Sequence, residues 1–249
     1  MYKMVIVIID SGVFRNHSLF KNDIIEEYTY LEENDCFINT EEKESDKFGH
    51  GTAIYNIVRA CRNFARIINI RIRNLENGIS EETLYSALKA VDTQFNPNVI
   101  NLSLGLNICN NEEMYMLCET IKNNGCIIVS AFDNTGSISY PAAFDNVIGV
   151  ITGQFCSKID EFEYINDDVV NVAAKGGIQR VAWTHPDYIM VGGNSFACAH
   201  VTVQVAKFIL EGATTKELII LEFKKISIKK SNIVSSFKPV CMCFPIKKA

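Results

Sequence analysis

The 249-residue sequence lacks any long apolar run and any excess of positive charge. A membrane-spanning helix needs about 20 consecutive, predominantly apolar residues, and no stretch of this chain approaches that length. The 24 lysine and arginine residues are outnumbered by 29 acidic residues, which gives a net charge of −5 at pH 7. Nucleic-acid-binding proteins contact phosphates with lysine and arginine. We therefore expect no membrane span and no nucleic-acid partner.

Paired cysteine spacings are also missing. The chain has nine cysteines but no CxxC pair, and the two closest are Cys241 and Cys243. An odd number without paired spacing fits free thiols in a reducing compartment better than a secreted disulfide framework. The N-terminal segment MYKMVIVIIDSG has too short an apolar run for a signal peptide and no small-residue cleavage site. We predict a cytoplasmic protein with no cofactor and no metal ion, and the oligomeric state stays open.

Segments typical of strands alternate with segments typical of helices. Residues 4–9 are continuously apolar and mostly β-branched, as in a strand buried on both faces of a parallel sheet. Further strands are expected at 67–72, just after Pro97, at 126–131 and at 147–151, with helices after His50, at about 80–95, at 111–123 and from 196 to 210. This alternation predicts an α/β fold, with a doubly wound, mostly parallel sheet and helices on both faces.

The domain organisation follows from length and charge. With 48% apolar and 21% charged residues, the chain has the composition of one globular domain, which we place at residues 1–223. Residues 224–249 contain seven lysines and no acidic residue, and we expect this basic tail to be peripheral. The acidic segment 26–46 is expected to be a solvated loop.

Residues 192–201, GGNSFACAHV, place a serine hydroxyl where a helix begins. Glycines before Ser195 allow a tight turn and the close approach of a substrate backbone. At the first turn of a helix, free N–H groups and the positive end of the helix dipole favour developing negative charge. Ser195 is therefore a candidate nucleophile, although most serines at this position only cap the helix.

A serine nucleophile needs a histidine base and a carboxylate that orients the histidine. Of the four histidines, only His50 lies between two glycines at the start of a helical pattern. His200 lies five residues after Ser195, about 140° around the same helix, and so points away. Asp10 ends the first buried strand, where open α/β sheets bind ligands, and is the candidate carboxylate. A turn-forming aspartate before glycine is the alternative for Asp10.

Four motifs in the order Asp, His, Ser resemble those of the subtilases, the subtilisin-like serine peptidases. They are IIDSGV at 8–13, DKFGHGT at 46–52, NLSLG at 101–105 and GGNSFACAHV at 192–201, and the resemblance covers roughly residues 3–211. It implies a Ser195 nucleophile, a His50 general base and then acid, and an Asp10 carboxylate that orients the imidazole.

The resemblance also implies an oxyanion hole and a peptide-binding cleft. Asn134, in AFDNTG at 131–136, would donate to the oxyanion together with the backbone N–H of Ser195. The segment SYPA at 139–142 resembles the floor of the family's main specificity pocket. The residues that would contact substrate are Ser103, Leu104, Gly105, Ala131, Phe132, Asp133 and Ser139.

Several positions depart from the family pattern, although none removes a catalytic group. Asn194 stands where threonine is usual, Phe196 where methionine is usual, Ala199 in place of proline and Ala53 in place of a second histidine. Asp133 replaces the usual glycine before the oxyanion asparagine, and its charge is expected to weaken oxyanion stabilisation. The family's N-terminal extension, inhibitory propeptide and one common calcium site have no expected counterpart.

The sequence thus predicts a serine endopeptidase that forms an acyl-enzyme. We expect a narrow substrate, such as a dedicated precursor peptide from which a leader is removed. Two alternatives stay open. One is a weak or inactive pseudopeptidase that binds peptides without turnover, and the other is a peptide ligase or macrocyclase, in which an amine outcompetes water for the acyl-enzyme.

Overall fold

The computed structural model describes residues 2–73, 78–106, 111–167 and 169–228. Its main sheet has nine strands in the order β3-β2-β4-β1-β5-β6-β7-β9-β8. The strands are β1 Met4–Asp10, β2 Glu26–Leu31, β3 Cys36–Asn39, β4 Ala65–Arg71, β5 Val99–Leu102, β6 Ile127–Ala131, β7 Ile148–Thr152, β8 Phe162–Tyr164 and β9 Val172–Ala174. A separate antiparallel pair consists of β10 Gln179–Ala182 and β11 Tyr188–Val191.

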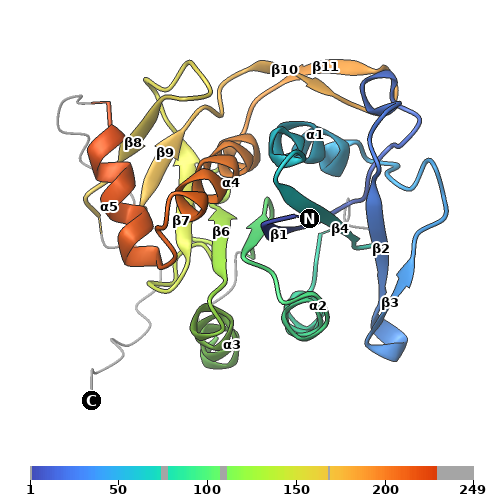
Figure 1. Ribbon diagram of the computed structural model, residues 1–249, viewed down its shortest axis with the longest axis horizontal. Helices are drawn as coiled ribbons and strands as arrows, with labels where there is room; N and C mark the ends of the chain where they lie inside the picture. The colour runs from blue at the N-terminus through green and yellow to red at the C-terminus, as the bar shows by residue number, and fades with distance from the viewer. Residues whose placement is uncertain (1, 74–77, 107–110, 168, 229–249) are drawn as a thin grey trace.

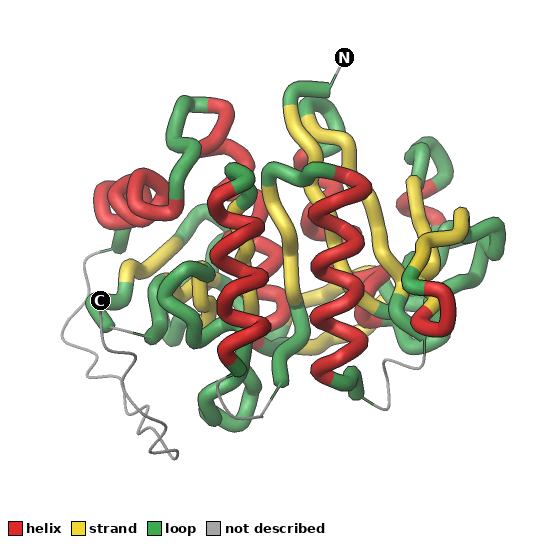
Figure 2. Tube along the Cα trace, turned by 90° about the horizontal axis from the view of Figure 1, so that it is seen from below, coloured by secondary structure: helices red, strands yellow, loops and turns green. Residues whose placement is uncertain are grey.

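The sheet is parallel from β2 to β9 and antiparallel only where β3 and β8 are added at its edges. Helices α1 (His50–Val58) and α4 (Asn194–Leu210) cover one face, and α2 (Glu81–Phe95) and α3 (Glu112–Asn123) cover the other (Figures 1 and 2). The predicted fold class, a doubly wound and mostly parallel α/β sheet, is confirmed.

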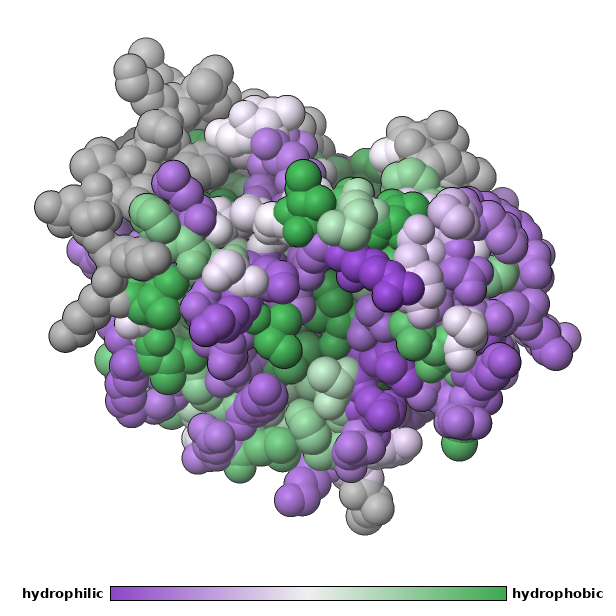
Figure 3. Space-filling view, turned by 90° about the horizontal axis from the view of Figure 1, so that it is seen from above, coloured by the Kyte–Doolittle hydropathy of each residue, from purple (hydrophilic) through white to green (hydrophobic). Residues whose placement is uncertain are grey.

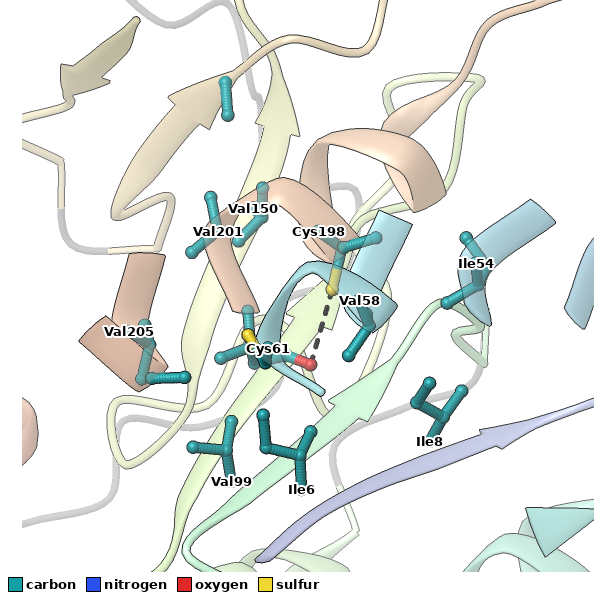
Figure 4. Close-up of a cluster of buried hydrophobic side chains, with 14 of the residues drawn as sticks. Ile6, Ile8, Ile54, Val58, Cys61, Val99, Val150, Cys198, Val201 and Val205 are labelled. Atoms are coloured by element: carbon teal, nitrogen blue, oxygen red, sulfur yellow. Dashed lines mark hydrogen bonds between the residues drawn. The ribbon is translucent and has the colours of Figure 1, made fainter. Parts of the chain in front are cut away.

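The face covered by α1 and α4 holds the largest buried cluster. Figure 4 shows Ile6 and Ile8 of β1 facing Ile54 of α1 and Cys198 of α4 across this layer. The Cys198 thiol is fully buried and donates to the carbonyl oxygen of Val129 at 3.4 Å. Burial raises its pKa, so Cys198 behaves as a small core side chain.

The position of β1 fixes where a ligand would bind. The chain runs from β1 outward to β2 and β4 on one side, and it continues through β5 and β6 on the other. In open α/β sheets, ligands bind outside the carboxyl ends of the strands at such a reversal of strand order. Asp10, Leu102 and Ala131 are the last residues of β1, β5 and β6, so these strands bring their following loops to one edge.

The acidic segment 26–46 is not the solvated loop that its charge suggested. It contains β2, a short helix at Glu32–Asn34 and β3, which together form the edge of the sheet. Tyr28 and Phe37 both pack against Phe95 of α2, with ring centroids 5.1 and 5.3 Å apart. Acidic charge is also paired with arginine in the ion pairs Arg15–Glu27, Arg66–Glu26 and Arg71–Glu42. The excess of acidic residues in this segment suggested a loop, but the alternating aromatic residues of the same segment form strands.

Helix α5 (Lys216–Ile226) packs beside β8 at the end of the sheet (Figure 1). The expected boundary between residues 223 and 224 falls inside this helix. Lys224 lies over the ring of Tyr164 at 4.6 Å, and the backbone N–H of Ile228 donates to Phe162. Residues 229–249 of the expected tail lie outside the described residues. Within the described ranges, no helix is long and apolar enough to cross a membrane.

Lys216 is a buried cation at the start of α5, and we expect it to make stability depend on alkaline pH. It is 9% exposed, and its Nζ donates to the carbonyl oxygen of Asp145 at 2.7 Å. Burial lowers the pKa of Lys216 to about 8 from 10.5. The unfolded chain therefore binds more protons than the folded chain between these values, and stability rises with pH across that window.

Urea unfolding of wild type and Lys216→Met between pH 7 and 10.5 measures this effect. The free energy of unfolding of wild type should gain at most about 3 kcal/mol relative to the variant across this range. Lys89→Met, at an exposed lysine, serves as the matched control. The difference in the free energy of unfolding between wild type and Lys89→Met should not change with pH. A constant difference between wild type and Lys216→Met at every pH would contradict the expectation.

Candidate active site

Asp10 and His50 meet at the end of β1. Asp10 is 2% exposed, and His50 is the first residue of α1. The imidazole Nδ1 lies 2.8 Å from Asp10 Oδ1 and 3.0 Å from Oδ2. Asp10 Oδ1 also accepts from the backbone N–H of Ser11 at 2.8 Å. The carboxylate is therefore fixed by its own strand end, and it fixes the tautomer and plane of the imidazole.

The two glycines that flank His50 each satisfy a steric requirement. Gly49 has φ +99°, a left-handed conformation, and a Cβ there would overlap the ring of Trp183. A Cβ at Gly51 would overlap the backbone carbonyl of Gly12 in the loop after β1. These close approaches bring the start of α1 against the end of β1, which is what allows His50 to reach Asp10.

Asp46, only 1% exposed, organises the turn that precedes His50. Its Oδ1 accepts from the backbone N–H groups of Phe48 at 3.0 Å and Gly49 at 2.7 Å, and from the hydroxyl of Ser11 at 3.0 Å. Its Oδ2 accepts from the backbone N–H of Thr52 at 2.9 Å and from the Thr52 hydroxyl at 2.6 Å. This carboxylate satisfies free N–H groups at the helix start and joins the turn to the strand end that carries Asp10.

Two buried carboxylates set the basicity of His50. Burial acts to lower the pKa of the imidazole. The negative charge of Asp10, its hydrogen bond to Nδ1 and the charge of Asp46 act in the opposite direction, and the pKa of His50 is raised above its ordinary value of 6.5. A raised pKa makes the imidazole a stronger proton acceptor, but only once the pH exceeds that pKa.

Replacing Asp46 by asparagine is expected to move the pH profile and to weaken the fold. The lost charge no longer raises the pKa of His50, so the ascending limb of kcat/KM should move to lower pH. The amide nitrogen cannot accept the hydrogen bonds of one carboxylate oxygen, which costs about 1–3 kcal/mol of stability.

A kcat/KM profile from pH 5 to 9 and a urea titration measure both effects. Glu33→Gln removes a charge from an exposed residue and serves as the control, with neither change expected. An unmoved limb in Asp46→Asn would show that its charge does not act on His50.

Ser195 lies in the first turn of α4 and is hydrogen-bonded to Ser103, the residue that follows β5. Its Oγ donates to the carbonyl oxygen of Ser103 at 3.0 Å, and the Ser103 hydroxyl donates to the Ser195 carbonyl at 3.1 Å. Behind this pair, Asn101 receives a hydrogen bond from Thr202 of α4 at 2.8 Å and donates to Ser103 at 2.9 Å. Among the described residues, no hydrogen bond links Ser195 to His50, although Phe196 contacts the imidazole ring with centroids 6.0 Å apart. The Ser195 hydroxyl is therefore engaged by the Ser103 carbonyl oxygen in this structure.

The side-chain amide of Asn134 lies beside the start of α4. Its Oδ1 accepts from the backbone N–H of Asn194 at 2.8 Å. This contact assigns the acceptor end of the amide to α4 and leaves the Nδ2 donors unpaired within the described part of the chain. The arrangement provides a donor beside Ser195 that could bind a developing oxyanion.

Asn194 connects three segments around this donor and is 9% exposed. Its Oδ1 accepts from the backbone N–H of Thr152 at 2.7 Å, at the end of β7. Its Nδ2 donates to the carbonyl oxygens of Phe132 and Asp133, both at 3.1 Å. The departure from threonine therefore gives this chain a side chain that positions the segment immediately before Asn134.

Asn194→Ala is expected to lower kcat on the order of 10²-fold with a smaller change in KM. Small displacements of catalytic groups cost about this much, and the variant frees the segment that carries Asn134. Steady-state kinetics in the wild-type and Asn134→Ala backgrounds form the test. If Asn194 acts through Asn134, Asn194→Ala should lower kcat much less in the Asn134→Ala background than in wild type. An equal fall in both backgrounds would assign Asn194 a purely structural role.

Six of the seven expected substrate-contacting residues lie at or just after the ends of β5 and β6, and Ser139 lies in the segment between β6 and β7. Gly105 lies against Ser139 and Ala131, because a Cβ at Gly105 would be 3.1 Å from Ser139 Oγ and 3.3 Å from the Ala131 carbonyl. Phe132 is 2% exposed and packs into a cluster with Ala142 and neighbouring residues, so its ring belongs to the core. Ser103 is buried, and Leu104 is half-buried.

Asp133 and Ser139 are joined by a hydrogen bond. The fully buried Ser139 accepts the backbone N–H of Asp133 on its Oγ at 3.0 Å. The carboxylate of Asp133 accepts from the backbone N–H of Thr135 at 2.7 Å and from the Thr135 hydroxyl. One oxygen of this carboxylate is therefore bound by its own loop.

The other histidines lie apart from this cluster. His17 binds the carbonyl oxygen of Asp187 at 2.7 Å, the exposed His185 contacts Phe14, and His200 lies 3.3 Å from Gln179. Within the described residues, no three histidine, cysteine, aspartate or glutamate side chains cluster closely enough to hold a metal ion.

Comparison with known proteins places this geometry in a family. The model of the subtilase family matches residues 2–220. The chain belongs to the subtilase family. The S41 psychrophilic protease has the same fold, with a TM-score of 0.68 and 19% identity over 90% of this chain and 82% of that structure.

Two relatives are similar in sequence to this subtilase. The major intracellular serine protease of Bacillus subtilis is 26% identical over 81% of this chain and 66% of the relative. The thermostable alkaline protease of Halalkalibacterium halodurans is 24% identical over 66% of this chain and 48% of the relative. The chain thus spans just under two thirds and about half of the lengths of these relatives.

Sequence reasoning did not assign roles to Asp46, Ser11 or the side chain of Asn194. Asp46 had a usable signal, because an aspartate shortly before an apolar helical pattern is a common helix-capping residue. Ser11 and Asn194 had no such signal. Their partners lie 35 or more residues away in sequence, at Asp46, Thr152 and Phe132.

Proposed function

We propose that this subtilase is a serine endopeptidase in which Ser195, His50 and Asp10 form the catalytic triad. The observation that carries this proposal is the pairing of His50 Nδ1 with the buried Asp10 carboxylate at 2.8 Å, beside the helix start that holds Ser195. The named activities of the relatives as serine and alkaline proteases support it.

The groups can carry out acyl transfer with balanced proton movements. Ser195 Oγ rotates from the Ser103 carbonyl, transfers its proton to His50 Nε2 and forms a bond to the scissile carbonyl carbon. The carbonyl electron pair moves to oxygen, where Asn134 Nδ2 and the Ser195 N–H stabilise the oxyanion. Collapse breaks the C–N bond, His50 donates its proton to the amine, and water repeats the sequence to release the acid. Asp10 holds the imidazole and stabilises its protonated form.

The substrate range is proposed to be narrow, with a dedicated precursor peptide as the substrate class. The approach of Gly105 to Ser139 and to the Ala131 carbonyl, which leaves little room for a side chain at that position, supports this proposal. We also propose a cytoplasmic location for this peptide maturation. The intracellular Bacillus relative supports it, as do the six described cysteines, none of which forms a disulfide.

Cleavage of a proteome-derived peptide library tests activity and range together. Wild type should cut a small set of peptides that share residues around the cut, and Ser195→Ala should cut none. Ser86→Ala, which changes a serine on α2 at the opposite face, should match wild type. Cutting by Ser195→Ala would overturn the assignment of the nucleophile, and broad digestion by wild type would overturn the narrow range.

A second candidate function is a peptide-binding module without turnover. The observation that favours it is the hydrogen bond from Ser195 Oγ to the carbonyl oxygen of Ser103, while the described residues show no hydrogen bond from Ser195 to His50. The same library separates the two functions, since a binding module would enrich peptides and return them intact.

A further inference from the structure

Glu27, on β2, is a buried carboxylate that the proposed peptidase mechanism does not use. Within the described ranges most charged side chains are at least partly exposed, and purple hydrophilic residues are spread over the face seen from above (Figure 3). Glu27 is 1% exposed, and its side chain has no exposed surface. Burying an ionisable group is costly unless specific partners replace the lost water. Glu27 finds such partners in two segments that lead to Asp10 and His50.

One of these segments is the loop that follows β1. A Cβ at Gly12 would lie 2.9 Å from Glu27 Oε1, so the carboxylate packs directly against the backbone of this loop. Arg15 of the same loop donates from Nε to Glu27 Oε2 at 3.3 Å. The Gly12 backbone also contacts Gly51, the residue after His50. Glu27 and the first turn of α1 therefore contact the same piece of backbone, just after the end of β1.

The other segment, residues 40–46, ends in the turn that precedes α1. Ser45 of this segment is fully buried, and its Oγ donates to Glu27 Oε1 at 2.5 Å. The same Oγ lies 3.0 Å from the Val13 carbonyl oxygen and accepts the Val13 N–H at 3.3 Å. Glu27 and Ser45 together therefore tie the loop after β1 to the turn before α1.

These contacts favour the ionised form of Glu27. The 2.5 Å separation between Ser45 Oγ and Glu27 Oε1 is typical of a hydroxyl that donates to a carboxylate. Arg15 pairs with Glu27 Oε2 and also donates from Nη2 to the Thr40 carbonyl oxygen at 2.7 Å, so it joins the two segments. Protonation of Glu27 would remove the charge with which Arg15 pairs and would loosen this connection.

The charged neighbours of Glu27 are two cations and two carboxylates. The buried or half-buried charged groups on the segments around it and at the end of β4 are Asp10, Arg15, Asp46 and Arg71. Asp10 accepts the N–H of Ser11, and Asp46 accepts the Ser11 hydroxyl. Burial raises the pKa of Glu27 to about 6, and the Ser45 hydrogen bond and the charges of the two arginines act against this rise. Glu27 is therefore largely ionised at pH 8 and largely neutral at pH 5.

We propose that Glu27 is a positioning residue for the Asp10–His50 pair, because its ionised carboxylate holds the loop after β1 against the turn that precedes α1. This inference rests on the proposed peptidase function. Gly12 lies two residues after Asp10 and contacts the residue after His50, so a shift of this loop changes how the carboxylate meets the imidazole. A displacement of about 1 Å near catalytic groups can cost about 10²-fold in rate. Loosening without loss of the fold should cost on the order of tenfold.

The ratio of kcat/KM between wild type and Glu27→Gln, measured from pH 5 to 8.5, tests this role. At pH 8 the ratio should be on the order of ten, because only wild type carries the charge. It should fall toward one at pH 5, with a midpoint at about pH 6, because protonation leaves wild type uncharged as well. Ionisation of His50 acts on both proteins alike and cancels in the ratio.

Glu26→Gln is the matched control, since Glu26 is the preceding residue of β2 and pairs with Arg66. Its ratio to wild type should stay close to one at every pH. A ratio for Glu27→Gln that does not change with pH would overturn the proposal, because a purely structural defect would lower activity equally across the range.

Ser45→Ala gives a second measurement that does not require Glu27→Gln to fold. Below about pH 6 the slope of log kcat/KM against pH should approach two in wild type, because Glu27 and His50 must both lose a proton. The Ser45 hydrogen bond lowers the pKa of Glu27, so the ionisation of Glu27 should move to higher pH in Ser45→Ala. A slope of one in wild type, with no such movement in Ser45→Ala, would contradict the role of Glu27.

Hydrogen exchange separates this inference from the peptidase function. The backbone N–H groups of residues 13–15 are hydrogen-bonded to the segment before α1 and to α1 itself. In the Ser195→Ala background, adding Glu27→Gln should speed their exchange several-fold at pH 7.5 and leave it unchanged at pH 5. This pattern would support the contact made by Glu27 even if wild type cleaved no peptide, a result that would reject the peptidase function alone. Equal exchange at pH 7.5 in the two proteins would overturn the positioning role.

Discussion

Ser195→Ala and His50→Ala should each lower kcat by about 10⁶-fold, and Asp10→Ala by about 10⁴-fold, with all three proteins folded. These magnitudes are those found when the corresponding groups of subtilisin are removed. Ser195 supplies the atom that bonds to the substrate, and His50 accepts and returns the proton, so neither has a substitute. Asp10 acts through the imidazole by fixing its plane and stabilising its charge, so its loss leaves more residual activity.

The double variant Ser195→Ala/His50→Ala should be no slower than either single variant, because residues that act as a unit are not additive. His185→Ala is the matched histidine control, since His185 is exposed and lies apart from the Asp10–His50 pair. Steady-state kcat, with circular dichroism to confirm folding, is the measurement. Cleavage by folded His50→Ala at the wild-type rate would remove His50 from the mechanism.

Asn134→Ala should lower kcat by about 10²–10³-fold and leave KM almost unchanged. The Nδ2 hydrogen bond strengthens as charge develops on the carbonyl oxygen, so its loss raises the barrier without weakening the bound substrate. The geometry supports this role because Oδ1 is already bound by the Asn194 N–H, which leaves Nδ2 available as a donor. The expected fall corresponds to about 2.7–4 kcal/mol of transition-state stabilisation.

Asn134→Asp sharpens the test, since it keeps the acceptor for Asn194 and replaces the donor by a charged oxygen. It should be at least as slow as Asn134→Ala, because a carboxylate would repel the oxyanion. Asn166→Ala, at an exposed asparagine near β8, is the control and should match wild type. A rise in KM at constant kcat would instead make Asn134 a ground-state contact and place the oxyanion hole elsewhere.

The sequence was most informative where a local pattern has one structural solution. The apolar, mostly β-branched run at 4–9 predicted a buried strand, and strand β1 ends at Asp10. Gly49 and Gly51 stood out because they flank His50 at the start of a helical pattern, and the structure shows that Trp183 and Gly12 leave no room for a side chain at either position. Ser80 and Asn111 cap α2 and α3 through their side chains, close to the starts expected for these helices.

The errors arose where burial depends on distant partners. The acidic segment at 26–46 forms strands for two reasons. Arginines from β4 and from the loop after β1 form ion pairs with its carboxylates, and Phe95 packs against its aromatic rings. Burial raises the pKa of Glu27 to about 6, with Ser45 and Arg15 acting against the rise. Counting the charges along one segment does not reveal its ion pairs and contacts with residues elsewhere in the chain.

Contacts inside the candidate site were beyond sequence reasoning for the same reason. The hydrogen bond between Ser195 and Ser103 joins residues 92 apart, and those of Asn194 with Phe132 and Thr152 join residues 62 and 42 apart. Asp133 was expected to oppose the oxyanion, and the engagement of its carboxylate by Thr135 could not be read from spacing. Residue types identified the groups, and only the fold determined their orientation.

Fluorophosphonate labelling of Ser195, located by peptide mass spectrometry and timed in wild type and His50→Ala, tests the central claim most directly. The reagent reacts with a serine hydroxyl only when a base activates it and an oxyanion hole receives the developing charge. One label per chain on Ser195 in wild type, and labelling slower by at least 10³-fold in His50→Ala, is the predicted result. Unlabelled wild type, or equal rates in the two proteins, would contradict a His50-activated Ser195 nucleophile.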